Sequence, residues 1–334
     1  MADTAMRPLL EVRNLTKTFV LNASVLNTLM RQPPVVVRAL SGVSFAIARG
    51  ETLGLIGESG CGKSTLGRTV LQLHRADSGT ITYDGTDLSA LPDEAIRPFR
   101  KRMQIIFQDP YASLNPRRSV AEIVGLPLRL HQGLGRAEAA ERAAAFLPKV
   151  GLQSGHLARY PHQFSGGQRQ RIGIARALIL HPEFVVCDEP VSALDVSIQA
   201  QIIELLQQFR AELNLTYLFI SHDLAVVGRL ADRIAVMYLG EIVEIGPRDA
   251  ILKAPAHPYT RALLSAAPRL HRRSGEARLR LTGDLPSPLA PPPGCRFHTR
   301  CPVAMARCRT EAPAVTRLAP GHDVACHLHE GGGS

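Results

Sequence analysis

The sequence predicts an α/β fold that contains a phosphate-binding loop, followed by a small cysteine-containing domain. Three observations support this prediction. Short apolar runs bounded by turn residues occur together with helix-favouring stretches along residues 1–265. A glycine-rich segment, Gly57–Thr65, lies between one such run and a predicted helix that reaches about Leu73. After about residue 270 the composition becomes rich in proline, arginine and cysteine, which indicates a separate domain over residues 266–334.

The first ninety residues are expected to form mainly strands. Apolar and polar residues alternate in the opening stretch, and the run ETLGLI is short, apolar and bounded by turn residues, as in a buried strand. An irregular insert over residues 21–34 interrupts this pattern, and Asp84-Gly85 is typical of a tight turn. The expected strands are residues 9–20, 35–40, 43–48, 51–56 and 81–83.

From about residue 93 to residue 180 the pattern is helical, and a helical subdomain is expected over about residues 96–180. The segment AEAAERAAAF is strongly helix-favouring, and residues 197–213 form an amphipathic pattern. Beyond this subdomain, short apolar runs return, and a Leu239-Gly240 pair separates two of them as a hairpin would. The expected strands here are residues 184–187, 215–220, 234–238 and 241–245.

Bulk composition limits where the chain works and what it binds. No run of eighteen apolar residues is present and the first residues lack a secretory signal, so a cytosolic protein is expected. Residues 269–310 carry nine arginines against Glu276 and Asp284, which supplies +7 of the net charge of +10. A generally arginine-rich composition is the favoured explanation for this positive charge. The alternative is a surface that binds nucleic acid, anionic lipid or an acidic partner. Since no RNA-binding or helix-turn-helix pattern is present, nucleic acid is not an expected partner.

The glycine-rich segment fits the phosphate-loop pattern G-x4-G-K-[ST] in full. Its glycines let backbone amides surround phosphate groups at a helix N-terminus, and Lys63 is expected to reach the β- and γ-phosphates. Ser64 is expected to bind Mg²⁺, and Cys61 fits a small space-filling residue better than a redox switch. A chance glycine-rich turn is the alternative. The expected ATP-binding residues of this loop are Gly57, Glu58, Ser59, Gly60, Cys61, Gly62, Lys63, Ser64 and Thr65.

Four further polar residues lie at the ends of predicted strands. Asp188 and Glu189 end the apolar run FVVCD, where Asp188 is expected to hold Mg²⁺ and Glu189 to polarise the attacking water. A solvated strand-end carboxylate is the alternative for Glu189. Gln108 follows an apolar stretch 45 residues after Lys63, and an amide there can contact the metal or the water. His222 closes residues 215–220 and can donate a hydrogen bond to a γ-phosphate oxygen. Alone, Gln108 and His222 are each more often structural residues.

The order of these motifs resembles that of ABC ATPases across residues 9–265. Gln108, the signature Ser165-Gly166-Gly167-Gln168, Asp188-Glu189, the loop Ser192–Asp195 and His222 follow one another as they do in that family. The resemblance implies a P-loop NTPase fold of ABC type: a RecA-like core, an antiparallel β-subdomain and an α-helical signature subdomain. It implies a head-to-tail dimer in which Ser165 and the Gly166-Gly167 amides bind the partner's γ-phosphate. Asp195 would bridge the two sites, and Phe19 would stack on adenine.

A narrower resemblance points to bacterial oligopeptide and dipeptide importers. It rests on the segment FQDPYASLNP (107–116), the long insert before residue 35, and the tail GDLPSP (283–288) followed by PPGCRFHTRCP (292–302). It implies the second of two ATPase subunits on the cytoplasmic face of the inner membrane. The implied partners are a related ATPase subunit, two membrane permease subunits and an extracytoplasmic peptide-binding protein. Nickel or glutathione importers and phosphonate-lyase-associated ATPases are the alternatives. DNA-repair or translation ABC proteins are disfavoured because they need tandem units or long coiled coils.

Four cysteines cluster in the C-terminal segment, separated by five, six and seventeen residues. In a cytosolic chain such a cluster favours metal over disulfides, and the absence of a CxxC pair argues against an ordinary zinc ribbon. A [4Fe–4S] cluster is favoured, because four thiolates can hold one and the importer resemblance implies one. Zn²⁺ and free thiols remain the alternatives, and nearby histidines leave mixed ligation open. The expected ligands are Cys295, Cys301, Cys308 and Cys326.

Overall fold

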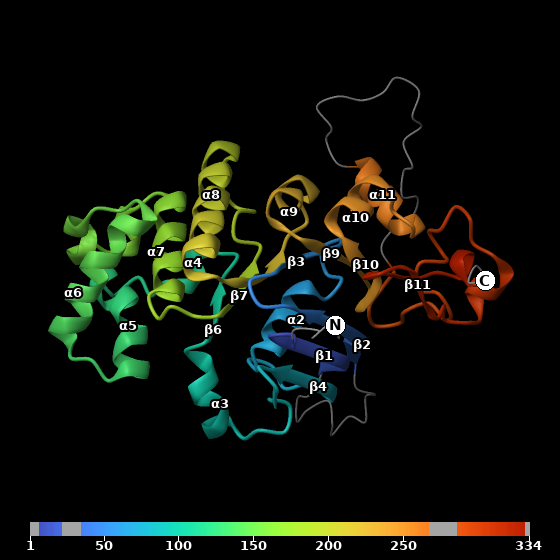
Figure 1. Cartoon of the computed structure of the whole chain (residues 1–334), viewed down its shortest axis with the longest axis horizontal. Helices are drawn as coiled ribbons and strands as arrows, with labels where there is room; N and C mark the ends of the chain where they lie inside the picture. The colour runs from blue at the N-terminus through green and yellow to red at the C-terminus, as the bar shows by residue number, and fades with distance from the viewer. Residues whose placement is uncertain (1–6, 22–34, 267–285, 331–334) are drawn as a thin grey trace, which may run out of the picture. The chain divides into compact units, whose positions relative to one another are not determined.

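The computed structural model describes residues 7–21, 35–266 and 286–330 (Figure 1), which separate into two compact units. The first unit comprises residues 47–52 and 90–221, and the second comprises residues 7–46, 53–89 and 222 onward. Each unit is therefore assembled from segments distant in the sequence. The expected boundary near residue 265 and the helical subdomain over residues 96–180 stay predictions.

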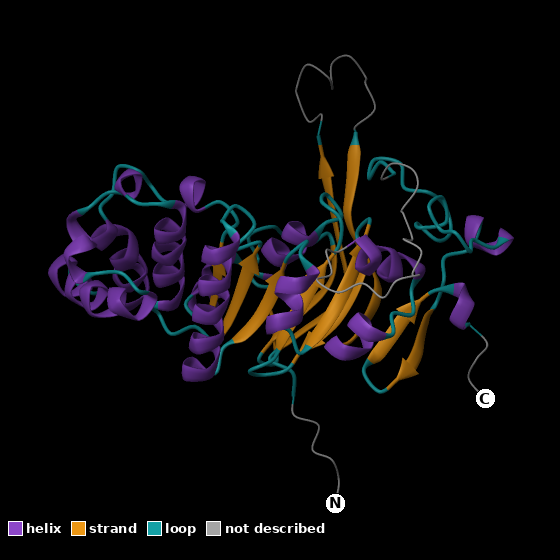
Figure 2. Ribbon diagram, turned by 90° about the horizontal axis from the view of Figure 1, so that it is seen from above, coloured by secondary structure: helices purple, strands orange, loops and turns teal. Residues whose placement is uncertain are grey.

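The first unit combines a parallel sheet with a group of helices. Strands β6, β7 and β8 pair in parallel, with Met103 opposite Phe184 and Phe184 opposite Thr216. Every residue of β7 and β8 is buried, because a parallel strand is covered on both faces. Helices α5, α6 and α7 gather at one end of the unit, on the left in Figures 1 and 2. The elements of this unit are α3 (Asp93–Arg100), β6 (Met103–Ile106), α4 (Pro110–Ser113), α5 (Val120–Gln132), α6 (Arg136–Phe146), α7 (Gly166–Leu178), β7 (Phe184–Asp188), α8 (Val196–Leu213) and β8 (Thr216–Ile220).

The second unit contains two sheets. One has the order β2-β1-β4-β5, and its β1–β4 and β4–β5 pairs are antiparallel. In the other, β3 pairs in parallel with β9, and β9, β10, β12 and β11 follow as antiparallel neighbours. The elements are β1 (Leu10–Val20), β2 (Val36–Ile47), β3 (Thr52–Ile56), α2 (Lys63–Val70), β4 (Ser78–Tyr83), β5 (Thr86–Asp87), α9 (Leu224–Leu230), β9 (Arg233–Tyr238), β10 (Glu241–Pro247), α10 (Arg248–Lys253), α11 (Pro258–Ala266), β11 (Val315–Ala319) and β12 (His322–Ala325).

Two expectations about strands differ from the structure. Residues 36–47 form one strand, β2, rather than two, because Gly42 adopts a φ of 71° and lets the strand continue through an irregular position. The helical stretch expected from residue 93 is interrupted by β6, whose four residues are too few to show a strand period. The hairpin is confirmed: Leu239 and Gly240 both have positive φ, as a two-residue turn requires.

The cysteine-containing segment, residues 286–330, extends the second sheet of its unit and is called the cysteine module below. Its strand β12 pairs with β10, placing Val324 opposite Glu244 and Asp323 opposite Ile245. Val324 is 1% exposed and forms a small core with Ala256 and Cys326. This pairing attaches the module to the unit that carries the glycine-rich loop.

Candidate functional site

The glycine-rich loop connects β3 to α2 in the second unit, as the sequence predicted. Gly60 and Gly62 have φ values of 79° and 108°, which L-residues with a side chain rarely adopt. A Cβ atom on Gly62 would lie 2.4 Å from the carbonyl oxygen of Ala39, so a larger residue does not fit there. Helix α2 begins at Lys63, so its first amide groups lack partners within the helix and face the loop. The loop has the backbone form and the polarity of an anion-binding site.

Lys63 lies within this loop, and its ammonium group donates hydrogen bonds to loop carbonyls. Its Nζ atom is 2.8 Å from the Gly57 oxygen and 2.9 Å from the Glu58 oxygen. The Cys61 sulfur is 3.9 Å from the same nitrogen, and burial raises the pKa of the Cys61 thiol. Cys61 is therefore a neutral, buried side chain, in keeping with the space-filling role expected for it.

Two residues that the sequence did not single out also contact this loop. The Tyr259 hydroxyl accepts a hydrogen bond from the Glu58 amide at 2.9 Å, and Arg300 forms an ion pair with the Glu58 carboxylate. They are separated from Glu58 by more than 200 residues of chain, and neither belongs to a nucleotide-binding motif. Arg300 lies within the CRFHTRCP segment, so that motif was the signal available for it.

The acidic pair and Gln108 come together in the first unit. Asp188 is buried at the last position of β7, and Glu189 follows it with a φ of 47°. The Gln108 side-chain amide donates a hydrogen bond to a Glu189 carboxylate oxygen at 3.1 Å. The Glu189 backbone amide also donates to the carbonyl oxygen of Ile220 on β8. A left-handed residue held at both ends in this way presents its carboxylate at the end of the parallel strands.

The signature tetrad forms the N-terminus of α7. The Ser165 hydroxyl accepts a hydrogen bond from the Gln168 amide, and the Gln168 side chain accepts one from the Ser165 amide. This capping box leaves Ser165 and Gly166 exposed at the positive end of a thirteen-residue helix. A Cβ atom on Gly167 would lie 2.6 Å from the Ile198 side chain, so glycine also allows close packing against α8.

The remaining predicted residues lie at separate positions. The loop after Glu189 is closed by a hydrogen bond from the Ser192 hydroxyl to the Glu189 carbonyl oxygen, and Asp195 is exposed at the start of α8. Phe19, on β1 in the second unit, makes an edge contact with the ring of His74. His222 is exposed next to Asp223, which caps α9. The roles assigned to all these residues stay predictions.

The four clustered cysteines line one small cavity in the cysteine module. His298, Met305 and His327 line it as well. All four cysteines are free thiols, and burial raises the pKa of the Cys295 thiol to about 11. In the ranges described above, no group of three or more His, Cys, Asp or Glu side chains is arranged to hold a metal ion. The cysteines thus converge on one place without forming a ligand set.

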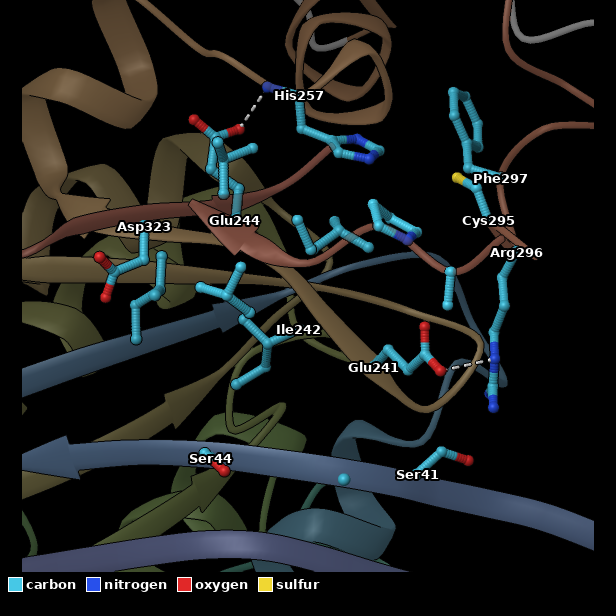
Figure 3. Close-up of a pocket in the computed structure, with 18 of the residues that line it drawn as sticks. Ser41, Ser44, Glu241, Ile242, Glu244, His257, Cys295, Arg296, Phe297 and Asp323 are labelled. Carbon is cyan, nitrogen blue, oxygen red and sulfur yellow. Dashed lines mark hydrogen bonds and ion pairs between the residues drawn. The ribbon is translucent and has the colours of Figure 1, made fainter. Parts of the chain in front are cut away.

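A larger cavity, of about 370 Å³, opens beside the module and is lined by residues of β2, β10 and β12 (Figure 3). Glu241 points toward Arg296 across its wall, at 2.8 Å, and burial raises the pKa of the Glu241 carboxyl. Glu244 accepts hydrogen bonds from the amides of Ala256 and His257. These carboxylates bind groups of the protein itself, and no residue of the glycine-rich loop lines the cavity.

Comparison with known proteins identifies the family. Residues 40–192 match the family described as ABC transporter, and residues 243–308 match the oligopeptide/dipeptide transporter C-terminal region. The chain is 49% identical over 324 residues to the oligopeptide transport ATP-binding protein AppF of Bacillus subtilis (strain 168), covering 96% of this chain and 97% of AppF. This chain belongs to the ATP-binding proteins of oligopeptide and dipeptide ABC transporters. A peptide import ATP-binding protein of Brucella ovis is 51% identical over 320 residues, again covering 96% and 97%.

Solved structures of ABC ATPases are similar to this chain, which agrees with its assignment to the family. The ATP-binding cassette MJ0796, in a dimeric post-hydrolysis state bound to ADP and Pi, has a TM-score of 0.63 at 28% identity and covers 72% of this chain and 98% of its own. CbiO1 of Clostridium perfringens, part of the cbiONQ complex, has a TM-score of 0.62 at 26% identity, covering 74% and 91%. The predictions of an ABC-type fold, of ATP hydrolysis and of a peptide-class importer are confirmed.

Family membership also supports the broader predictions about cofactors and partners. ABC ATPases use ATP and Mg²⁺, and the ATPase of a peptide importer works with membrane permease and substrate-binding proteins. The ABC ATPase is accordingly a peripheral, membrane-associated protein. Within residues 7–21, 35–266 and 286–330, no helix combines the length and apolarity needed to cross a membrane.

Proposed function

We propose that this ABC ATPase hydrolyses ATP with Glu189 as the group that polarises the attacking water, and that it does so on the cytoplasmic face of a bacterial inner membrane. The observation that carries the assignment is the 3.1 Å hydrogen bond from Gln108 to Glu189. It holds the carboxylate of a strained, left-handed residue in one orientation, and a fixed carboxylate acts better on a water molecule than a mobile one.

The glycine-rich loop is proposed to bind the triphosphate. The amides at the start of α2 and the Lys63 ammonium supply positive charge for the β- and γ-phosphates. Ser64 and Asp188 offer a hydroxyl and a carboxylate, which are the oxygen ligands that Mg²⁺ prefers, and the bound ion would offset phosphate charge. Phe19 is proposed to stack on adenine and His222 to donate a hydrogen bond to the γ-phosphate.

A second ATPase chain is proposed to complete each active site. Ser165 and Gly166 lie exposed at the N-terminus of α7, where the Ser165 hydroxyl and the Gly166-Gly167 amides offer a surface suited to an anion that another chain brings. The dimeric, ADP- and Pi-bound state of MJ0796 supports an arrangement of this kind. The partner is proposed to be a related ATPase subunit, beneath two permease subunits that receive peptides from an extracytoplasmic binding protein.

Substitution of Glu189 by Gln tests the catalytic assignment. We expect ATP turnover to fall by about 100-fold or more, as for loss of a general base, while ATP binding is retained. Glutamine keeps the shape of the side chain but removes its charge. Because hydrolysis would reopen the dimer, ATP should also shift the variant to a dimer in size-exclusion chromatography, with the related ATPase subunit present and not with this chain alone.

A matched control for this experiment is Glu138→Gln, because Glu138 forms an exposed ion pair with Arg142 on α6. That variant should hydrolyse ATP at the native rate. Undiminished turnover in Glu189→Gln would overturn the role of Glu189. A dimer formed by this chain alone would overturn the proposed heterodimer and leave the catalytic role in place.

We further propose that the four cysteines of the module hold a [4Fe–4S] cluster. The support is that Cys295, Cys301, Cys308 and Cys326 line a single cavity, which is the ligand number that such a cluster requires. Their present arrangement is not a ligand set, so the thiols would have to deprotonate and draw together around the metal.

Anaerobic purification followed by absorption spectroscopy and metal analysis tests the cluster. We expect broad visible absorption and iron, both lost in a Cys301→Ser variant and retained in a Cys187→Ser variant. Cys187 is the control because it is buried in β7, in the first unit. If the analysis finds zinc and no iron, the cysteines hold a zinc site and the cluster proposal is wrong. If it finds neither metal, metal binding by the module is contradicted altogether.

A further inference from the structure

The cysteine module contacts the phosphate-binding loop through an arginine. Arg300 donates two hydrogen bonds to the Glu58 carboxylate, from Nη1 to Oε2 at 2.6 Å and from Nη2 to Oε1 at 3.0 Å. The Arg300 side chain is only 7% exposed and that of Glu58 is 26% exposed. A two-point, partly desolvated pair of this kind fixes direction as well as distance, unlike an ion pair between mobile surface side chains.

Packing holds Arg300 in place on the module side. Its backbone amide donates to the carbonyl oxygen of Phe297 at 3.0 Å, and the Phe297 ring packs against Tyr238 and Tyr259 at centroid distances of 5.3 Å. Tyr238 and Tyr259 are fully buried. Because the Tyr259 hydroxyl also accepts a hydrogen bond from the Glu58 amide, the same aromatic cluster supports both contacts with the loop.

Glu58 transmits this support to the lysine that faces phosphate. Its carbonyl oxygen accepts a hydrogen bond from Lys63 at 2.9 Å, so the backbone of Glu58 helps to set the position of the Lys63 ammonium. Its carboxylate has a second effect, since an uncompensated negative charge in this loop would repel a triphosphate. The Arg300 guanidinium neutralises that charge where the loop has to accept an anion.

We infer that Arg300 is a positioning residue of the ATPase: through Glu58 it holds the phosphate-binding loop in a form that accepts ATP, and so links ATP binding to the cysteine module. The inference rests on the proposed role of the loop in phosphate binding. Arg300 need not contact the nucleotide, because its effect passes through the Glu58 side chain and backbone.

A double-mutant cycle tests this inference in the full-length protein. Arg300→Gln should raise both the dissociation constant for ATP and the KM by about 10-fold, in line with loss of a charged hydrogen-bonded pair. The kcat should change by less than about 2-fold, because the group that acts on water is untouched. In a Glu58→Gln background, the same Arg300→Gln change should alter KM by less than about 2-fold, since the contact is already lost.

Arg317→Gln is the matched control, because Arg317 forms an ion pair with Asp323 on the exposed side of the same module. It should leave the KM for ATP at the native value. Arg300→Lys keeps the charge but not the two-point geometry, and should give an intermediate KM. Glu58→Gln lies outside the module and therefore reports on the loop even if a change at Arg300 were to unfold the module.

Two outcomes would overturn the role of Arg300. One is a native KM in folded Arg300→Gln protein. The other is an undiminished effect in the Glu58→Gln background, which would mean that Arg300 acts elsewhere. Lys63→Ala separates failure of this inference from failure of the proposed loop function: ATP binding that survives Lys63→Ala would contradict the phosphate role of the loop itself.

Discussion

His257 lies in the interior of the second unit as a neutral imidazole. Its Nδ1 atom accepts a hydrogen bond from the Tyr259 amide at 3.0 Å, which requires that nitrogen to be unprotonated. Burial lowers the pKa of His257 to about 4, although the carboxylate of Glu244 acts in the opposite direction, and His329 and Arg261 lower it further. A proton on this ring would be desolvated and would break the hydrogen bond that begins α11.

This residue makes the stability of the protein depend on pH. Between pH 6.5 and pH 4 the unfolded chain binds a proton on His257 and the folded chain does not, so the free energy of unfolding decreases as the pH falls. Between pH 6.5 and pH 5 we expect this residue to lower the free energy of unfolding by about 1.5 kcal/mol. A His257→Gln variant should show a shallower loss of thermal midpoint over that range.

His162→Gln is the control for this comparison, because His162 is exposed. That variant should lose stability between pH 6.5 and pH 5 as the native protein does. An equally steep loss in His257→Gln would contradict the neutral, buried histidine.

Strand β12 of the cysteine module contributes a buried aliphatic side chain, Val324, to the second unit. Val324 is 1% exposed, whereas Val315 on the neighbouring β11 is 70% exposed. Truncation of a buried aliphatic side chain leaves a cavity, while truncation of an exposed one removes little contact. We expect Val324→Ala to lower the free energy of unfolding by about 2 kcal/mol and Val315→Ala to leave it nearly unchanged. Chemical denaturation of both variants checks this, and equal losses would contradict the burial of β12.

The elements that the sequence predicted well are those with a strong local signal. The buried runs of β3, β7 and β8, the loop glycines and the Leu239-Gly240 turn all depend on residues close together in the chain. The elements missed lack such a signal. Residues 315–325 alternate little, and the pairing of β12 with β10 follows from long-range contacts that local patterns do not contain.

At the scale of the whole molecule, the order of the motifs predicted the family, which the comparisons confirm, and the roles of the motif residues stay predictions. Gln108 and Glu189 lie 81 residues apart, yet the expectation that both serve one site agrees with their hydrogen bond. The contacts of Arg300 and Tyr259 with Glu58 were not predicted. Residues that form an ion pair or a hydrogen bond across a fold have no fixed spacing in the sequence, so no local pattern marks them. The basic segment over residues 269–310 and the insert over residues 21–34 each lie partly outside the described residues.

The pairing of Glu58 with Arg300 spans 242 positions of the chain. During synthesis from the N-terminus, the loop leaves the ribosome long before the arginine that completes its support is translated. A nascent chain or a prematurely terminated product would therefore carry an intact glycine-rich motif with an unsupported loop. If Arg300 has the proposed role, only a polypeptide that includes residue 300 would bind ATP at full strength, so shorter products would compete poorly for the nucleotide.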